Sequence, residues 1–170
     1  MPDRPWRRFF FDTVTLGNFA LAGCFGLLVD RYGKSLSVTE QVLVELAAGR
    51  AGGYAGLEAV EAALSAGAIS QAGPMDTAER ESFAELLRTF GAGEASCIAF
   101  ALQRGRVVVS DDRTARRRCA SHGILVTGTI GILQALAANR IVSAAEADAL
   151  LARMVEVGFY SPIRRVSDLV

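Results

Sequence analysis

Three consecutive valines, Val107 to Val109, followed at once by Ser110-Asp111-Asp112, restrict the fold more than any other feature of this chain. Valine is β-branched and favours strands, and a strand without alternating polar residues is usually covered on both faces. The bulky run from Arg7 to Phe11, which ends at Asp12, has the same character. We therefore expect buried strands whose carboxyl ends are followed by acidic residues.

Short strand patterns alternate with helical patterns along the chain. Further strands are expected at 35–38, 68–70 and 124–126, and helices at 13–32 (broken at Gly23), 39–46, 57–66, 77–90, 94–103, 113–121, 129–138 and 144–157. Thr39 and Thr77 are the predicted N-caps of their helices, and the Gly-rich stretch 48–56 is predicted to be a loop. Such alternation implies an α/β fold of three layers, a twisted, mostly parallel sheet flanked by helices. A length of 170 residues predicts one domain over 1–170, with a C-terminal helix and tail (about 143–170) packing on it.

Composition excludes several classes of protein. The eighteen acidic and eighteen basic residues cancel, so no overall field marks the chain as a nucleic-acid binder. No apolar run reaches the roughly 18 residues of a membrane span, and the first residues lack the apolar stretch of a secretory signal. We therefore predict a cytoplasmic protein that does not enter membranes. The three cysteines, Cys24, Cys97 and Cys119, are odd in number and widely spaced, which favours buried thiols over disulfides or a zinc site.

The acidic residues offer the strongest clue to chemistry. Asp12 and the Asp111-Asp112 pair follow predicted strands, where sites form in parallel sheets, and Glu45 and Glu94 lie in predicted helices. A hard cation such as Mg²⁺ or Mn²⁺ prefers carboxylate oxygens, and a cluster holding it can activate water for attack on a phosphodiester.

Each acid also has a purely structural interpretation. Asp12 and Asp112 suit helix N-caps, Glu94 suits a first helical turn, and Glu45 suits a solvated helix face. Spacing along the chain does not decide whether these side chains converge.

Several short segments resemble the motifs of one family. They are Asp12-Thr13-x-x-Leu16, Val38-Thr39-x-x-Val42-x-x-Glu45-Leu46, Gly93-Glu94-Ala95, the segment 107–112 followed by Ala115-Arg116, the stretch 123–131, and Gly158-Phe159. In this order and spacing they resemble the PIN-domain family, in particular small prokaryotic proteins related to VapC-type toxin ribonucleases. The resemblance covers nearly the whole chain and is weakest between 49 and 92.

The resemblance implies a PIN-like fold and a metal-dependent endoribonuclease for single-stranded RNA, which needs Mg²⁺ or Mn²⁺. It further implies a toxin of a type II toxin–antitoxin pair, a cognate antitoxin as a possible partner, and a homodimer. The residues it assigns to catalysis are Asp12, Glu45, Glu94 and Asp112, and those it assigns to the metal are Asp12, Glu94, Asp112 and Asp111.

Basic residues follow the acidic pair closely. Seventeen of the eighteen cations are arginines, and five lie between Arg106 and Arg118. Arginine binds phosphate well because its planar fork donates two hydrogen bonds. We predict that Arg113 and Arg116, together with Thr13, contact the substrate, although neighbouring arginines on a helix cannot all face one ligand.

Two other functions remain open on sequence grounds. In the PIN family a small hydroxyl residue often stands two positions after the first acid, where this chain has Val14, and this departure supports a catalytically weak or inactive module that binds RNA or protein. A DNA-directed nuclease would use the same residues. The aromatic run from Trp6 to Phe11 suits base stacking, but a buried strand explains its phenylalanines more simply.

Overall fold

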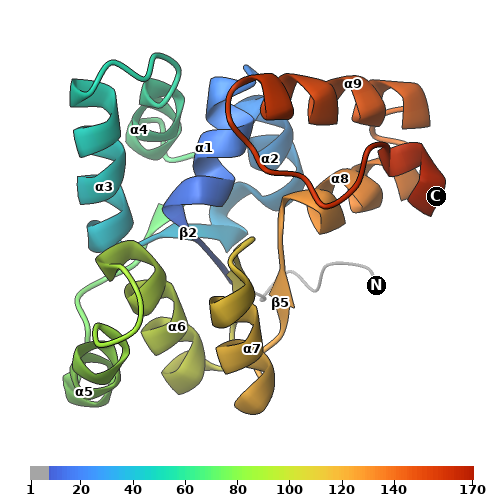
Figure 1. Cartoon of the computed structure of the whole chain (residues 1–170). Helices are drawn as coiled ribbons and strands as arrows, with labels where there is room; N and C mark the ends of the chain where they lie inside the picture. Colours follow the sequence, from blue (N-terminus) through green and yellow to red (C-terminus); the bar gives the residue numbers. More distant parts are fainter. Residues whose placement is uncertain (1–7) are drawn as a thin grey trace.

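A computed structural model describes residues 8–170, and one parallel sheet runs through this part of the chain (Figure 1). Its strands are β1 (Phe9–Phe11), β2 (Leu36–Val38), β3 (Ser70–Gln71), β4 (Val107–Val109) and β5 (Val126–Thr127). Their order is β3-β2-β1-β4-β5, and every pairing is parallel. The central strand β1 pairs Phe10 with Ser37 on one side and with Val108 on the other. The predicted α/β fold is confirmed, and the sheet is parallel throughout.

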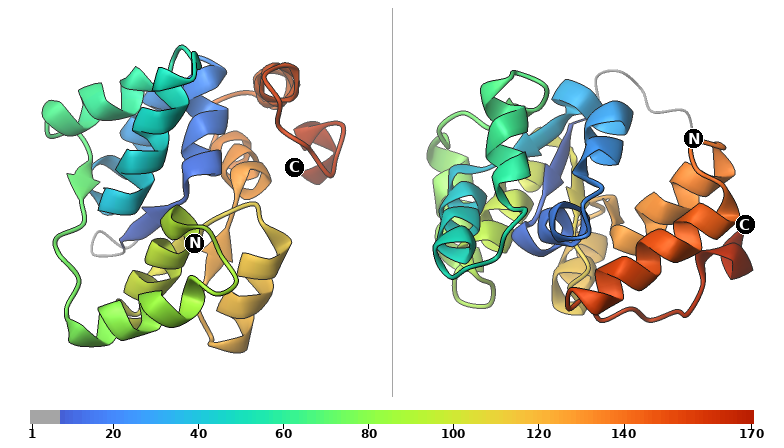
Figure 2. Two further views of the ribbon diagram at one scale, coloured as in Figure 1. Left: turned by 60° about the vertical axis from the view of Figure 1, so that its left-hand side comes forward. Right: turned by 90° about the horizontal axis from the view of Figure 1, so that it is seen from above.

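Helices connect and cover these strands (Figure 2). They are α1 (Thr13–Leu21), α2 (Phe25–Tyr32), α3 (Glu40–Ala51), α4 (Glu58–Ser65), α5 (Thr77–Leu86), α6 (Ala92–Arg104), α7 (Arg113–Ser121), α8 (Thr129–Ala138) and α9 (Ala144–Glu156), with short 3-10 helices at Gly33–Ser35 and Val166–Leu169.

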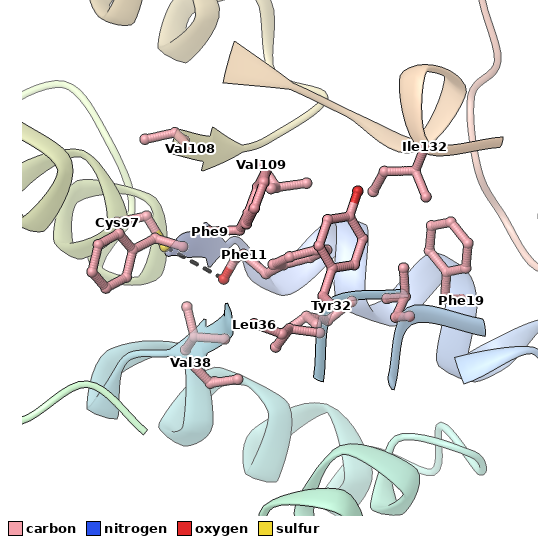
Figure 3. Packing of buried hydrophobic residues seen from close by; sticks show 14 of the residues in the cluster. Phe9, Phe11, Phe19, Tyr32, Leu36, Val38, Cys97, Val108, Val109 and Ile132 are labelled. Atoms are coloured by element: carbon pink, nitrogen blue, oxygen red, sulfur yellow. Dashed lines mark hydrogen bonds between the residues drawn. The ribbon is translucent and has the colours of Figure 1, made fainter. Parts of the chain in front are cut away.

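The side chains of β1 show how the layers are held together. Successive residues of a strand point to opposite faces. Phe9 and Phe11 contact the ring of Tyr32 in α2, with centroids 4.9 and 5.3 Å away, whereas Phe10 stacks on Phe100 of α6 at 5.2 Å. Figure 3 places Cys97 of α6 and Tyr32 on opposite sides of these strands. Helices α2 and α6 therefore cover opposite faces of the sheet, in the predicted three layers.

The three cysteines are free and buried, as predicted. Cys97 donates through its Sγ to the carbonyl oxygen of Phe11 at 3.4 Å (Figure 3). Burial raises the pKa of the Cys97 thiol well above its usual range. The thiol therefore stays protonated in the core.

Helix α3 is longer than predicted, because 48–51 is helical and not a loop. The misleading residue is Gly49, which has helical conformation here. A Cβ at Gly49 would approach the Cδ1 of Leu57 to 2.9 Å. Glycine therefore serves close packing against the next segment at this position rather than a turn.

The start of α5 also differs from the prediction. Asp76, and not Thr77, is the N-cap: its carboxylate accepts the N–H of Glu79 at 2.8 Å, and Glu79 accepts the N–H of Asp76 at 2.9 Å. This reciprocal capping box satisfies two backbone donors, which a threonine one position later does not achieve. The helix ends at Leu86 and not near Phe90.

The strand after α7 begins two residues later than predicted. The N–H of Ile124 donates to the carbonyl of Cys119 at 2.9 Å, which closes the last turn of α7. The N–H of Ile124 is therefore used at the end of the helix and not in the sheet, and β5 starts at Val126.

The C-terminal part of the chain packs beside α8. Helix α9 contacts α8, and the 3-10 helix at Val166–Leu169 contacts both (Figure 1). Within residues 8–170, no helix by itself is long and apolar enough to cross a membrane. Helices α1 and α2 with the following turn reach that length and hydropathy only together, and they are bent by 119° at their break.

Candidate active site

A cleft of about 770 Å³ lies where β1 and β4 end. Because the strands are parallel, their carboxyl ends meet at one edge: the N–H of Asp12 bonds to Val109 at 3.0 Å, and that of Ser110 bonds to Thr127 at 2.9 Å. All five predicted acids line this cleft, namely Asp12, Glu45, Glu94, Asp111 and Asp112. The tertiary structure thus brings together residues as far apart as 12 and 112, which spacing left undecided.

Asp12 combines the capping role with a position in the cleft. It caps α1 by accepting the N–H of Thr15 at 2.7 Å, and it is only 4% exposed. Burial raises the pKa of its carboxyl to about 6. The structural interpretation of Asp12 is therefore correct, but it does not exclude chemistry, because the cap uses one oxygen of the two.

Glu94 is the second acid of the cleft whose pKa is strongly raised. It lies in the first turn of α6, half-buried, and accepts the hydroxyl of Ser110 at 2.8 Å. Burial, with smaller contributions from the negative charges of Asp112, Asp12 and Glu45, raises its pKa to about 7, although the Ser110 hydrogen bond acts in the opposite direction. Such repulsion among carboxylates is what a bound cation would relieve.

Glu45 is held rigidly between two other helices. Its carboxylate accepts the N–H of Gly93 at 2.8 Å and the hydroxyl of Thr13. A Cβ at Gly93 would overlap the Glu45 carboxylate and lie 2.9 Å from the Thr13 hydroxyl. Gly93 is therefore required for this close approach, and Glu45 joins α3 to α1 and α6 instead of lying on a solvated face.

The two adjacent aspartates after β4 have different surroundings. Asp111 accepts the N–H and the hydroxyl of Thr129 at 2.8 and 2.5 Å, and the amide of Asn18 at 3.3 Å. Asp112 is exposed and caps α7 by accepting the N–H of Ala115 at 2.7 Å. Asp111 thus connects α1 and α8 with both oxygens, whereas the second oxygen of Asp112 makes no hydrogen bond within the described residues.

The arginines of α7 point in different directions, as the helix geometry requires. Arg113 lines the cleft, and Arg116 donates to the carbonyl of Ser110 at 3.1 Å. Arg118 points elsewhere and lies 3.7 Å from Glu85. Thr13 also lines the cleft, although its hydroxyl is engaged by Glu45.

Sequence reasoning missed two buried polar residues of this site. Ser110 is fully buried and contacts Glu94, and its hydroxyl also accepts the N–H of Asp112 at 3.1 Å. Asn18 is 7% exposed and lies on the apolar face of α1. A lone amide on an apolar helix face was the available signal for Asn18, because buried polar groups need partners. Trp6 lies outside the described residues.

The fit of a divalent cation can be tested on these donors. Oxygen ligands from carboxylates are what Mg²⁺ and Mn²⁺ prefer, and the mutual repulsion at Glu94 favours a cation. Within residues 8–170, however, no three side chains of His, Cys, Asp or Glu converge into a closed ligand set. The donor chemistry fits a cation such as Mg²⁺, which keeps several waters and takes one or two carboxylates directly.

One comparison with known proteins agrees with the fold. A family model described as a PIN domain matches residues 8–170. The chain therefore belongs to the PIN-domain family, whose members are generally nucleases and typically use divalent metals. A search of curated proteins returned no match.

The two raised pKa values predict how the stability of the metal-free protein depends on pH. The carboxyls of Asp12 and Glu94 bind protons more tightly when folded, with pKa values of about 6 and 7 against ordinary values of 3.8 and 4.5. Their contribution to stability is therefore fully present below about pH 4 and is lost as the pH rises toward 7. In EDTA, the difference in melting temperature between Glu94→Gln and the unaltered protein should grow in favour of the variant between pH 4.5 and 8. If the two curves of melting temperature against pH ran parallel over that range, the raised pKa of Glu94 would be contradicted.

Proposed function

We propose that this protein is a metal-dependent endoribonuclease that hydrolyses phosphodiesters of single-stranded RNA. The observation that carries the proposal is that five carboxylates and Arg113 line one cleft at the carboxyl edge of the sheet. A nuclease needs both, because the acids hold the cation and the arginine offsets the charge of the substrate phosphate.

In the proposed mechanism, Asp12, Glu94 and Asp112 would hold Mg²⁺ or Mn²⁺, one or two of them directly and the rest through water. The cation would supply an activated water and stabilise charge on the phosphate. Glu45, fixed by Gly93 and Thr13, positions water beside it. Asp111, which sequence reasoning also assigned to the metal, uses both oxygens in hydrogen bonds to α1 and α8. We therefore assign it to holding the edge of the cleft in place.

The substrate contacts belong to the same cleft. Arg113 lines it and is exposed, so its guanidinium can approach a phosphate from solvent. Arg116 is anchored on Ser110 and adds positive charge nearby. Thr13 contributes by holding Glu45 and by lining the cleft.

The experiment is cleavage of a mixed pool of single-stranded RNA by the purified protein, in Mn²⁺ and in EDTA, beside the Asp112→Asn variant. Asparagine caps helices as well as aspartate does, so this variant should keep the α7 cap and the fold while losing one metal ligand. We expect metal-dependent cutting that disappears in the variant. A matched single-stranded DNA pool tests the preference for RNA. Folded protein that cuts no RNA in Mn²⁺ would refute the proposal.

One observation favours a second candidate, a catalytically weak or inactive module that binds RNA or protein. No three carboxylates within residues 8–170 converge as a ligand set, and Val14 is 59% exposed at the mouth of the cleft. However, two threonine hydroxyls next to Val14 do contact the acids. The hydroxyl of Thr13 donates to Glu45, and that of Thr15 donates to Asp111 at 3.4 Å. Hydroxyls therefore surround the site despite Val14, and we favour the catalytic function.

The biological setting is a further part of the proposal. The resemblance to VapC-type proteins supports a toxin of a type II toxin–antitoxin pair that acts as a homodimer in the cytoplasm. A cognate antitoxin would then inhibit by occupying the acidic cleft. The corresponding expectation is that inducing the protein arrests growth and that inducing Asp112→Asn does not.

A further inference from the structure

The acidic cleft continues into a second hollow, whose aromatic lining has no part in the proposed mechanism. This second hollow has a volume of about 400 Å³ and lies over β5 and the start of α8. It shares Arg113, Phe159 and Tyr160 with the acidic cleft. A ligand longer than the scissile group can therefore pass from one hollow to the other without leaving the surface.

Tyr160 stands between the two hollows and is 92% exposed. It follows Phe159, which is 8% exposed and anchored in the core, with its N–H bonded to Met154 at 2.9 Å. On the other side, Ser161 accepts the N–H of Ile163 at 3.2 Å and donates to its carbonyl at 2.7 Å. The tyrosine ring is thus presented to solvent by a segment that is fastened on both sides.

The charges of the second hollow differ from those of the acidic cleft. Arg113 and Arg116 both line it, and the carboxylate that borders it, Asp111, is engaged by Thr129 and Asn18. Positive side chains beside an exposed aromatic ring are the combination that binds single-stranded nucleic acid, because the cations contact the backbone and the ring stacks on a base. An exposed tyrosine is also suited to stacking because every base presents a π face.

We propose that the second hollow binds the nucleotide next to the cleaved bond, with its base stacked on Tyr160 and its phosphate held by Arg113. Tyr160 is then a determinant of substrate binding rather than of the chemical step. This inference rests on the proposed function, since it assumes that a nucleic-acid strand occupies the acidic cleft.

The test uses a fluorescein-labelled single-stranded RNA of about ten nucleotides and the full-length protein. The affinity of the protein for this RNA is measured by fluorescence anisotropy in EDTA. KM and kcat for cleavage of the RNA are measured in Mn²⁺. We expect Tyr160→Ala to raise the dissociation constant or KM by about 5- to 100-fold, the loss typical of one stacked base, with kcat changed less. Tyr160→Phe, which keeps the ring, should stay within about twofold. Tyr54→Ala removes another exposed tyrosine, outside both hollows, and should have no effect.

A set of oligonucleotides each lacking one base identifies the partner of Tyr160. If the ring stacks on a base, removal of that base weakens binding to the unaltered protein, and Tyr160→Ala adds nothing further, as a double-mutant cycle requires. Equal losses in Tyr160→Ala and Tyr160→Phe would overturn stacking, and so would unchanged KM and affinity in Tyr160→Ala. A hexa-aspartate peptide, whose charge is opposite to that of Arg113 and Arg116, serves as a second probe. If Tyr160→Ala weakens binding of the peptide but not of the RNA, the hollow belongs to a protein partner and the inference fails.

The outcome separates this inference from the proposed function. Protein that cleaves RNA normally after Tyr160→Ala refutes the second hollow as a nucleotide site and leaves the nuclease intact. Unaltered protein that neither binds nor cleaves any RNA refutes both.

Discussion

Replacing Glu94 by glutamine should lower metal-dependent RNA cleavage by about 100-fold or more. The change removes a negative charge from the proposed metal site but keeps an oxygen for the Ser110 hydrogen bond. A metal ion stabilises the transition state by several kcal/mol, and each 1.36 kcal/mol corresponds to about a tenfold change in rate. The measurement is the initial rate of cleavage of a single RNA substrate at saturating Mn²⁺.

Glu40→Gln is the matched control for this prediction. Glu40 lies in the first turn of α3 as Glu94 lies in the first turn of α6, but it is exposed and does not line the acidic cleft. If Glu94 acted only on the helix dipole, the two variants would lose stability alike and keep activity. We expect instead that Glu94→Gln is more stable at pH 7.5 without metal and gains less melting temperature from millimolar Mn²⁺. If Mn²⁺ raised the melting temperature of Glu94→Gln, Glu40→Gln and the unaltered protein equally, a role of Glu94 at the metal would be contradicted.

Replacing Asp111 by alanine should destabilise the protein by about 2–5 kcal/mol. The N–H and hydroxyl of Thr129 are buried and would lose their acceptor, whereas the amide of Asn18 would keep only its bond to the Thr129 hydroxyl at 3.0 Å. Each unsatisfied buried donor costs about 1–3 kcal/mol. Gly128 supports this contact, because a Cβ there would overlap the Asp111 carboxylate. The free energy of unfolding, from urea titration in EDTA, measures the effect.

The adjacent Asp112→Ala provides the comparison. Asp112 is exposed, and the main interaction that Asp112→Ala removes is the α7 cap, which is worth about 1 kcal/mol. Asp111→Ala should therefore be the more destabilising of two neighbouring changes, and Asp112→Ala the more damaging to cleavage. If Asp111→Ala instead stabilises the metal-free protein, relief of repulsion dominates and Asp111 belongs with the metal ligands.

The position of Asp12, Asp111 and Asp112 at the sheet edge could be predicted from the sequence because the strands that precede them are unambiguous, whereas Glu45 and Glu94 lie in helices and were indicated by motif resemblance. A valine run covered on both faces is typical of a central strand, and the residues directly after such a strand lie at the sheet edge. The predictions fail where one residue type serves two purposes. Gly49 permits packing against Leu57, although glycine is also a loop signal, and Thr77 is next to the aspartate that makes the capping box.

The sequence alone determined the fold class and the family and indicated which acids are candidates for the site, since strand propensity, helix periodicity and motif order are local properties. Only the tertiary structure decided how those acids differ. Burial raises the pKa of Asp12 and Glu94, whereas Asp111 is held by Thr129 and Asn18 from helices far away in the chain. No local pattern indicates that Tyr160 stands between two hollows. Burial, charge repulsion and hydrogen bonding depend on neighbours in space, and those neighbours exist only after the sheet has assembled.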